Sequence, residues 1–173
     1  MIAGSVGPLS RPVSVRHLPA GGLEATVEAT AEERAALAAD LGLPELRALT
    51  ARFLLTGNPT HVRVRGRLKA LAVQTCVVTL DEFASSLDEA IEVEFRSPPG
   101  VDADGQAGGE HEANLDAPDE LVGELVDLGA ITAEFLALSL DPYPRKPGVE
   151  FATDPGDAAG GSPFAALAPL RKS

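Results

Sequence analysis

Apolar and charged residues alternate through the middle of the sequence. From Val62 to Lys69 apolar residues take turns with basic ones, and from Leu87 to Phe95 they take turns with acidic ones. Successive side chains of a β-strand point to opposite faces, so a period of two predicts strands with one face buried and the other in water. Because one outer face is basic and the other acidic, we expect these two strands to pair. Gly66 interrupts the first strand and indicates a β-bulge.

Shorter alternating segments precede this pair of strands. Residues 11–17 and 23–29 alternate apolar with polar side chains, and Pro19–Gly22 between them has the composition of a turn. Two strands joined in this way favour a β-hairpin. Another strand is predicted around Arg52–Leu55, before the turn at Gly57–Pro59.

Two helices are marked by their capping residues. Thr30 and Glu33 form a capping box in front of an Ala-rich and Leu-rich segment that Gly42 ends, which predicts a short helix over 31–41. Asp127 caps a longer amphipathic helix that stops at Asp141–Pro142, with one apolar face formed by Leu128, Ile131, Phe135 and Leu138. The pattern predicts an α+β fold, with an antiparallel sheet of about six strands, open or barrel-like, and one short and one long helix.

The composition indicates one folded domain, residues 10–150, with polar extensions. Residues 97–119 are rich in Pro, Gly, Asp and Glu, and we expect a mobile acidic loop there, which serves solubility or mimics phosphate toward a basic partner. Residues 1–9 are expected to be a flexible N-terminus. Residues 151–173 are expected to be a flexible C-terminal tail with a short apolar end.

Cysteine and histidine usage argues against catalytic and metal sites. Cys76 is the single cysteine, so this chain alone cannot form a disulfide or a thiolate zinc site, and its apolar neighbours favour a structural role. His17, His61 and His111 lie in different segments without ligand-like spacing. We therefore expect no metal, no cofactor and no enzymatic activity.

The N-terminus and the hydropathy pattern favour a cytoplasmic protein. The first residues lack a cationic start followed by an apolar run, and no stretch reaches 18 uninterrupted apolar residues. Membrane insertion is therefore not expected.

Charge is segregated along the chain, whose net charge is −12. Residues 11–70 hold nine Arg and Lys against six Asp and Glu, whereas residues 71–173 hold five against twenty. The basic row of the first part is a candidate phosphate-binding face, because alternate strand residues are spaced about as far apart as single-strand phosphates. Pairing with Glu92 and Glu94 across the strands, or a plain solvated face, is the alternative explanation. The row consists of Arg63, Arg65, Arg67 and Lys69.

The segment Asp141-Pro-Tyr-Pro-Arg-Lys-Pro-Gly148 is the second candidate binding site. Its three prolines favour an extended path, which lowers the entropic cost of docking to a partner. Tyr143 is the single tyrosine, and Arg145 and Lys146 form a cationic pair in an acidic half of the chain. Asp141 opposes the helix dipole unless its side chain starts the turn or pairs with Arg145. Helix termination alone is the alternative role of this segment.

Several stretches together resemble the bacterial YceD family of large ribosomal RNA subunit accumulation proteins. They are Val64–Cys76, Thr79–Phe83, the helix from Asp127 into Leu136–Gly148, and Pro163–Lys172, and the form of Asp141–Gly148 is similar to the alphaproteobacterial branch. The resemblance spans roughly residues 10–172. Many members have a second cysteine where this chain has Thr79, so a metal or redox role of those cysteines does not carry over.

The resemblance implies a non-enzymatic factor for 23S rRNA accumulation and large ribosomal subunit biogenesis. The implied partner is a ribosomal precursor particle or a ribosomal protein, with rRNA as a second candidate and no DNA. The alternative function is an acidic protein-interaction adaptor outside the ribosome, linked to phospholipid synthesis.

Overall fold

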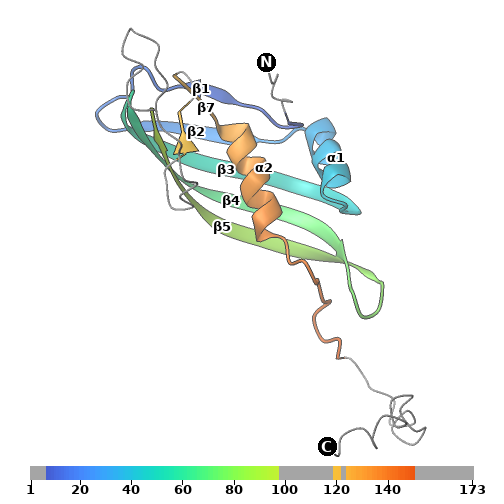
Figure 1. Cartoon of the computed structure of the whole chain (residues 1–173). Helices are drawn as coiled ribbons and strands as arrows, with labels where there is room; N and C mark the ends of the chain where they lie inside the picture. The colour runs from blue at the N-terminus through green and yellow to red at the C-terminus, as the bar shows by residue number, and fades with distance from the viewer. Residues whose placement is uncertain (1–6, 98–118, 122–123, 151–173) are drawn as a thin grey trace, which may run out of the picture.

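The computed structural model describes residues 7–97, 119–121 and 124–150 (Figure 1). The acidic loop expected at 97–119 lies outside these residues except for its two ends, and the C-terminal tail expected at 151–173 lies outside them entirely. Two helices and two sheets make up the described part, which confirms the α+β class.

The main sheet has the strand order β2-β3-β4-β5-β6, and its four longer strands are all antiparallel. The two-residue strand β6 pairs parallel with the end of β5. A second, two-stranded sheet pairs β1 with β7. The strands are β1 (Pro12–Ser14), β2 (Leu23–Glu28), β3 (Glu45–Asn58), β4 (His61–Thr75), β5 (Glu82–Arg96), β6 (Asp119–Glu120) and β7 (Leu125–Asp127).

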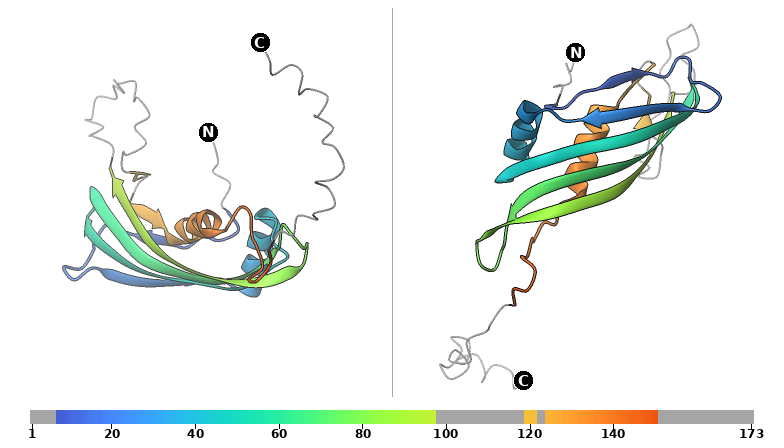
Figure 2. Two further views of the ribbon diagram at one scale, coloured as in Figure 1. Left: turned by 90° about the horizontal axis from the view of Figure 1, so that it is seen from below. Right: turned by 180° about the vertical axis from the view of Figure 1, so that it is seen from behind.

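The main sheet is strongly curved and remains open (Figure 2). The barrel-like alternative is wrong, because β2 and β5 do not pair with each other and α2 (Leu128–Ser139) lies in the concave side of the sheet. Helix α1 (Ala31–Asp40) packs at one end of that side. The core fills the space between sheet and helices, with fully buried Leu55, Val64 and Leu68 from the sheet and Leu128 and Leu136 from α2.

Both helices begin at the predicted residues. Thr30 accepts a hydrogen bond from the Glu33 backbone while Glu33 accepts one from the Thr30 backbone, which completes the capping box of α1. Asp127 caps α2. The predicted contrast in length is small, since α1 has 10 residues and α2 has 12.

The predicted hairpin of residues 11–17 and 23–29 is wrong. Strand β1 pairs with β7, with Val13 opposite Val126, and β2 pairs with β3 instead. Strand β1 is drawn away from β2 by a residue far along the chain. The Asp127 carboxylate accepts hydrogen bonds from the Ser10 hydroxyl and the Arg11 backbone, and these bonds hold the start of β1 beside α2.

The predicted pairing of the basic and acidic strands is confirmed, but Gly66 forms no bulge. The β4–β5 register runs without a shift from His61 opposite Arg96 to Thr75 opposite Glu82. Gly66 instead leaves room for the ring of Phe53, since a Cβ atom at Gly66 would lie 2.6 Å from Phe53 Cδ1. The one register shift of the β3–β4 pair lies between Leu46 and Ala48.

Candidate interaction surfaces

The basic row of β4 lies on the outer face of the sheet and is largely paired with β5. Arg63 donates to Glu94 and Arg65 donates to Glu92 at 3.0 Å from Nη2 to Oε1. Arg67 donates diagonally to Asp88, and this hydrogen bond lowers the pKa of the Asp88 carboxyl. A phosphate that approached these arginines would compete for each guanidinium with a carboxylate that is already bound to it. The cross-strand explanation of the row therefore describes its geometry.

Three cations of the outer face have no ion pair within the part of the chain that the structure describes. They are Lys69, which stands opposite Asp88 in register, Arg52, which stands opposite Arg67, and Arg96, which stands opposite His61. All three side chains are exposed. The unpaired positive charge of this face is thus three separate residues rather than a continuous row.

Residues 141–146, the fastened segment, are held by hydrogen bonds and an ion pair to the end of β4 and to the turn between β4 and β5. The Val77 amide donates to the Pro144 carbonyl at 2.9 Å, and the Gln74 side chain donates to the Asp141 carbonyl at 3.3 Å. The Lys146 amide donates to the sulfur of Cys76 at 3.4 Å, and Lys146 Nζ lies 3.4 Å from Asp81. The segment is held by a sheet turn remote in sequence as well as by the preceding helix.

Asp141 starts the turn that follows α2. Its Oδ1 accepts a hydrogen bond from the Tyr143 amide at 2.8 Å, which is one of the two roles that its position after the helix allows. Its carboxylate therefore serves the local backbone and makes no ion pair with Arg145 within the described residues.

Tyr143 stands out from this fastened segment with 72% of its surface exposed. Val77 and Leu80, on the turn that holds the segment, are also exposed large apolar residues. Leu80 has φ 61, a left-handed conformation that is costly for leucine, and its amide is bound to the Cys76 carbonyl. The sequence singles out Tyr143, whereas it gave no reason to separate Val77 and Leu80 from the buried apolar residues around them.

Cys76 lies directly after β4, fully buried beneath the fastened segment. Hydrogen bonds from the Lys146 backbone and from Thr79 lower the pKa of its thiol to about 6. No group of three or more His, Cys, Asp or Glu side chains suited to a metal ion occurs within residues 7–97, 119–121 and 124–150.

Replacing Cys76 with Ala is expected to lower the free energy of unfolding by about 1–2 kcal/mol and to leave function intact. The loss comes from the removed sulfur and from the unpaired Lys146 amide. Cys76→Ser, which retains an acceptor, is the matched control. Denaturant unfolding and metal analysis of the purified protein check this. Stoichiometric zinc, or a folded Cys76→Ala protein without function, would contradict it.

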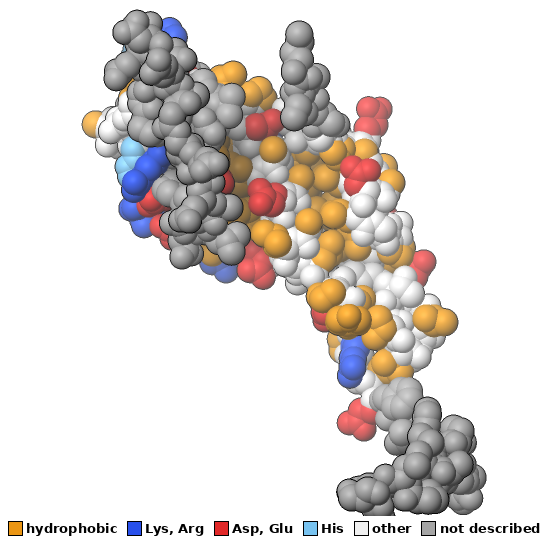
Figure 3. All heavy atoms as spheres, in the orientation of Figure 1, with side chains coloured by type: hydrophobic (Ala, Val, Ile, Leu, Met, Phe, Trp, Pro, Cys, Tyr) orange, Lys and Arg blue, Asp and Glu red, His pale blue; other side chains and the backbone are white. Residues whose placement is uncertain are grey.

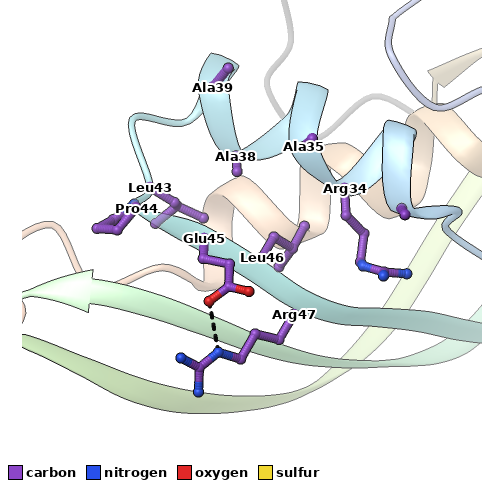
Figure 4. A pocket seen from close by; sticks show the side chains of 10 residues that line it. Arg34, Ala35, Ala38, Ala39, Leu43, Pro44, Glu45, Leu46 and Arg47 are labelled. Atoms are coloured by element: carbon purple, nitrogen blue, oxygen red, sulfur yellow. Dashed lines mark hydrogen bonds and ion pairs between the residues drawn. The ribbon is translucent and has the colours of Figure 1, made fainter.

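A hollow with a volume of about 500 Å³ lies between α1 and the start of β3 (Figure 4). Small apolar residues of α1, Ala35, Ala38 and Ala39, line one side of it. Its charged residues are engaged already, because Arg34 donates to the Ala29 carbonyl and Glu45 is paired with Arg47 at 2.8 Å. The lining brings no nucleophile together with a base.

Comparison with protein-family models, with curated proteins and with solved structures found no match. Among the described helices, none is both long and apolar enough to cross a membrane.

Proposed function

We propose that this chain is a non-enzymatic factor in the biogenesis of the large ribosomal subunit, which supports 23S rRNA accumulation by binding a ribosomal precursor particle or a ribosomal protein. The proposal rests on the family resemblance of the sequence. The observation that supports its mode of action is the exposed Tyr143 on a segment fixed by hydrogen bonds to the β4–β5 turn. A fixed backbone that presents an exposed aromatic ring loses little entropy on binding.

Protein contact is favoured over direct rRNA contact. Three of the four cations of the basic row already neutralise carboxylates of β5, so exchange of a carboxylate for a phosphate adds little net attraction. The fastened segment, in contrast, offers apolar area beside the exposed side chain of Arg145. The main contact surface is therefore assigned to Tyr143, Arg145 and the turn residues Val77 and Leu80.

Sedimentation tests the proposal. Tagged protein is run through sucrose gradients of cell extract, and we expect it to travel with precursors of the large subunit. Tyr143→Ala should remove it from those fractions, while Leu125→Ala, which changes an exposed apolar residue elsewhere, should not. Recovery of a protein partner from the same extract at the same salt, with no association with ribosomal precursors, would favour an adaptor outside the ribosome.

Changing Arg63, Arg65 and Arg67 together to Gln is expected to alter the salt dependence of particle binding by less than about one unit of log–log slope. Three free arginines on phosphate would contribute about two to three units, since each phosphate contact releases counterions. Arginines that are already paired with carboxylates release few counterions when the protein binds the particle. Binding measured between 50 and 300 mM salt checks this.

The matched control is Glu92→Gln with Glu94→Gln, which frees Arg63 and Arg65 from their partners. This variant should bind single-stranded RNA more tightly than the wild type. A slope reduced by two units or more in the folded triple variant would show that the row contacts phosphate in the complex.

A further inference from the structure

Strand β5 has one long edge without a partner. Its first edge pairs with β4 along its whole length, but β6 pairs only with Phe95 and Arg96 of the second edge. From Glu82 to Glu94 the second edge pairs with no strand among the described residues (Figure 2). Alternate residues of an antiparallel edge direct their N–H and C=O groups outward, so this edge offers a row of free hydrogen-bonding groups.

Apolar side chains flank this edge on the concave side. Leu87 and Val93 of β5 are half-buried there. Beside them a hollow of about 300 Å³ lies between β5 and α2, lined in part by Phe135 and Leu138, and Leu138 is 72% exposed. Figure 3 shows this face, with hydrophobic side chains gathered over α2 and acidic ones around them. An added strand would therefore have apolar surface to cover on its inner side.

Glu89 determines which strand can be added. It stands between Leu87 and Ile91 in the alternation that places apolar residues on the concave side, yet it is exposed and lines the hollow. It has no ion pair among the described residues. An inward-facing charge on an edge strand disfavours an apolar or acidic partner strand and favours one with a cation at the facing position.

We propose that the free edge of β5 binds an extended, basic segment of a partner protein as an additional strand, with apolar side chains over the hollow and a Lys or Arg side chain against Glu89. A second copy of this chain is disfavoured, since two β5 edges would place acidic residues opposite each other. Nucleic acid is disfavoured because the phosphates would face the same carboxylates. The proposal goes beyond the proposed function, because it holds for a basic segment of any partner protein.

The test uses a capped eleven-residue peptide with threonine at odd positions, valine at even positions and lysine in the centre. We expect titration into the full chain to shift the amide NMR signals of β5, and those of the edge strand β2 to stay unchanged. A peptide with glutamate in the centre should bind about tenfold more weakly. A peptide N-methylated at the alternate residues whose amides face β5 cannot donate hydrogen bonds to the edge carbonyls and should not bind.

The decisive variant is Glu89→Lys, which should reverse the preference between the lysine and glutamate peptides. Glu89→Gln should remove the preference, and it provides the test if Glu89→Lys fails to fold. Glu32→Lys changes the same charge on the exposed face of α1 and should leave the preference unchanged. The proposal is overturned if the lysine peptide fails to bind or shifts β2, if the N-methylated peptide binds equally well, or if single-stranded RNA displaces the lysine peptide from β5.

Discussion

Asp127→Ala is expected to lower the free energy of unfolding by about 3 kcal/mol. Asp127 accepts four hydrogen bonds. Its Oδ1 accepts from the backbone amides of Arg11, Gly129 and Ala130, and its Oδ2 accepts from the Ser10 hydroxyl at 2.6 Å. Loss of a helix cap costs about 1 kcal/mol, and each partly buried donor left without a partner costs about 1 kcal/mol more.

Asp127→Asn is the matched control, because its amide oxygen can replace Oδ1 for all three backbone donors. It should cost less than half as much as Asp127→Ala. Denaturant unfolding, with the slope compared among the three proteins, measures both effects. A loss below about 1 kcal/mol for Asp127→Ala would show that water replaces the carboxylate and that β1 does not depend on it.

The hydrogen bonds of Asp127 and the ion pair between Arg11 and Glu33 make the free energy of unfolding sensitive to acid. Burial raises the pKa of Asp127, but hydrogen bonds from Ser10 and from the backbone outweigh it, so the pKa lies below its ordinary value of 3.8. The Arg11 side chain is the main cause that lowers the pKa of Glu33 to about 2. Both folded-state pKa values are depressed, so this stabilisation is complete above about pH 4.5 and is lost as pH falls toward 2. Asp127→Asn should flatten that dependence.

Local signals in the sequence were sufficient for the helices and for the central strand pair. The capping box of α1 lies within four residues. The basic residues of β4 alternate with apolar ones in the same way as the acidic residues of β5, the next strand along the chain, so the pairing of these two strands does not depend on distant contacts. The hairpin prediction failed because Asp127 binds residues more than a hundred positions earlier in the chain. The prediction of a β-bulge at Gly66 was wrong for the same reason, since the Phe53 ring, which lies where a Gly66 side chain would be, belongs to another strand.

The candidate site was predicted only in part. Three prolines and a single tyrosine identify residues 141–148 from sequence, but the bonds that hold the segment join Val77 to Pro144 and Cys76 to Lys146 across about 70 positions. No local pattern encodes these contacts. The left-handed backbone of Leu80 has a local cause, because its amide donates to the Cys76 carbonyl four positions earlier, but the apolar residues around this turn give no sign in the sequence that Leu80 is exposed.

Tyr143→Ala combined with Arg145→Ala is expected to abolish 23S rRNA accumulation to the level of a deletion strain, while the melting temperature stays within a few degrees of the wild type. Tyr143 is 72% exposed and Arg145 is exposed, and substitutions at such positions seldom cost more than about 0.5 kcal/mol. The backbone bonds of Pro144 and Lys146 do not need either side chain. The fold and the docking function should therefore separate in this variant.

The control pair is Leu125→Ala with Arg47→Ala, which removes an exposed apolar residue and an exposed cation elsewhere on the molecule. It should retain rRNA accumulation. If the Tyr143 and Arg145 variant unfolds, the segment serves as a clasp that closes the β4–β5 turn over Cys76. If it stays folded and retains function, partner binding does not use this segment, and the β5 edge becomes the leading surface for partner contact. Because the two surfaces lie on separate elements, Glu89→Lys and the Tyr143 variant together distinguish these cases.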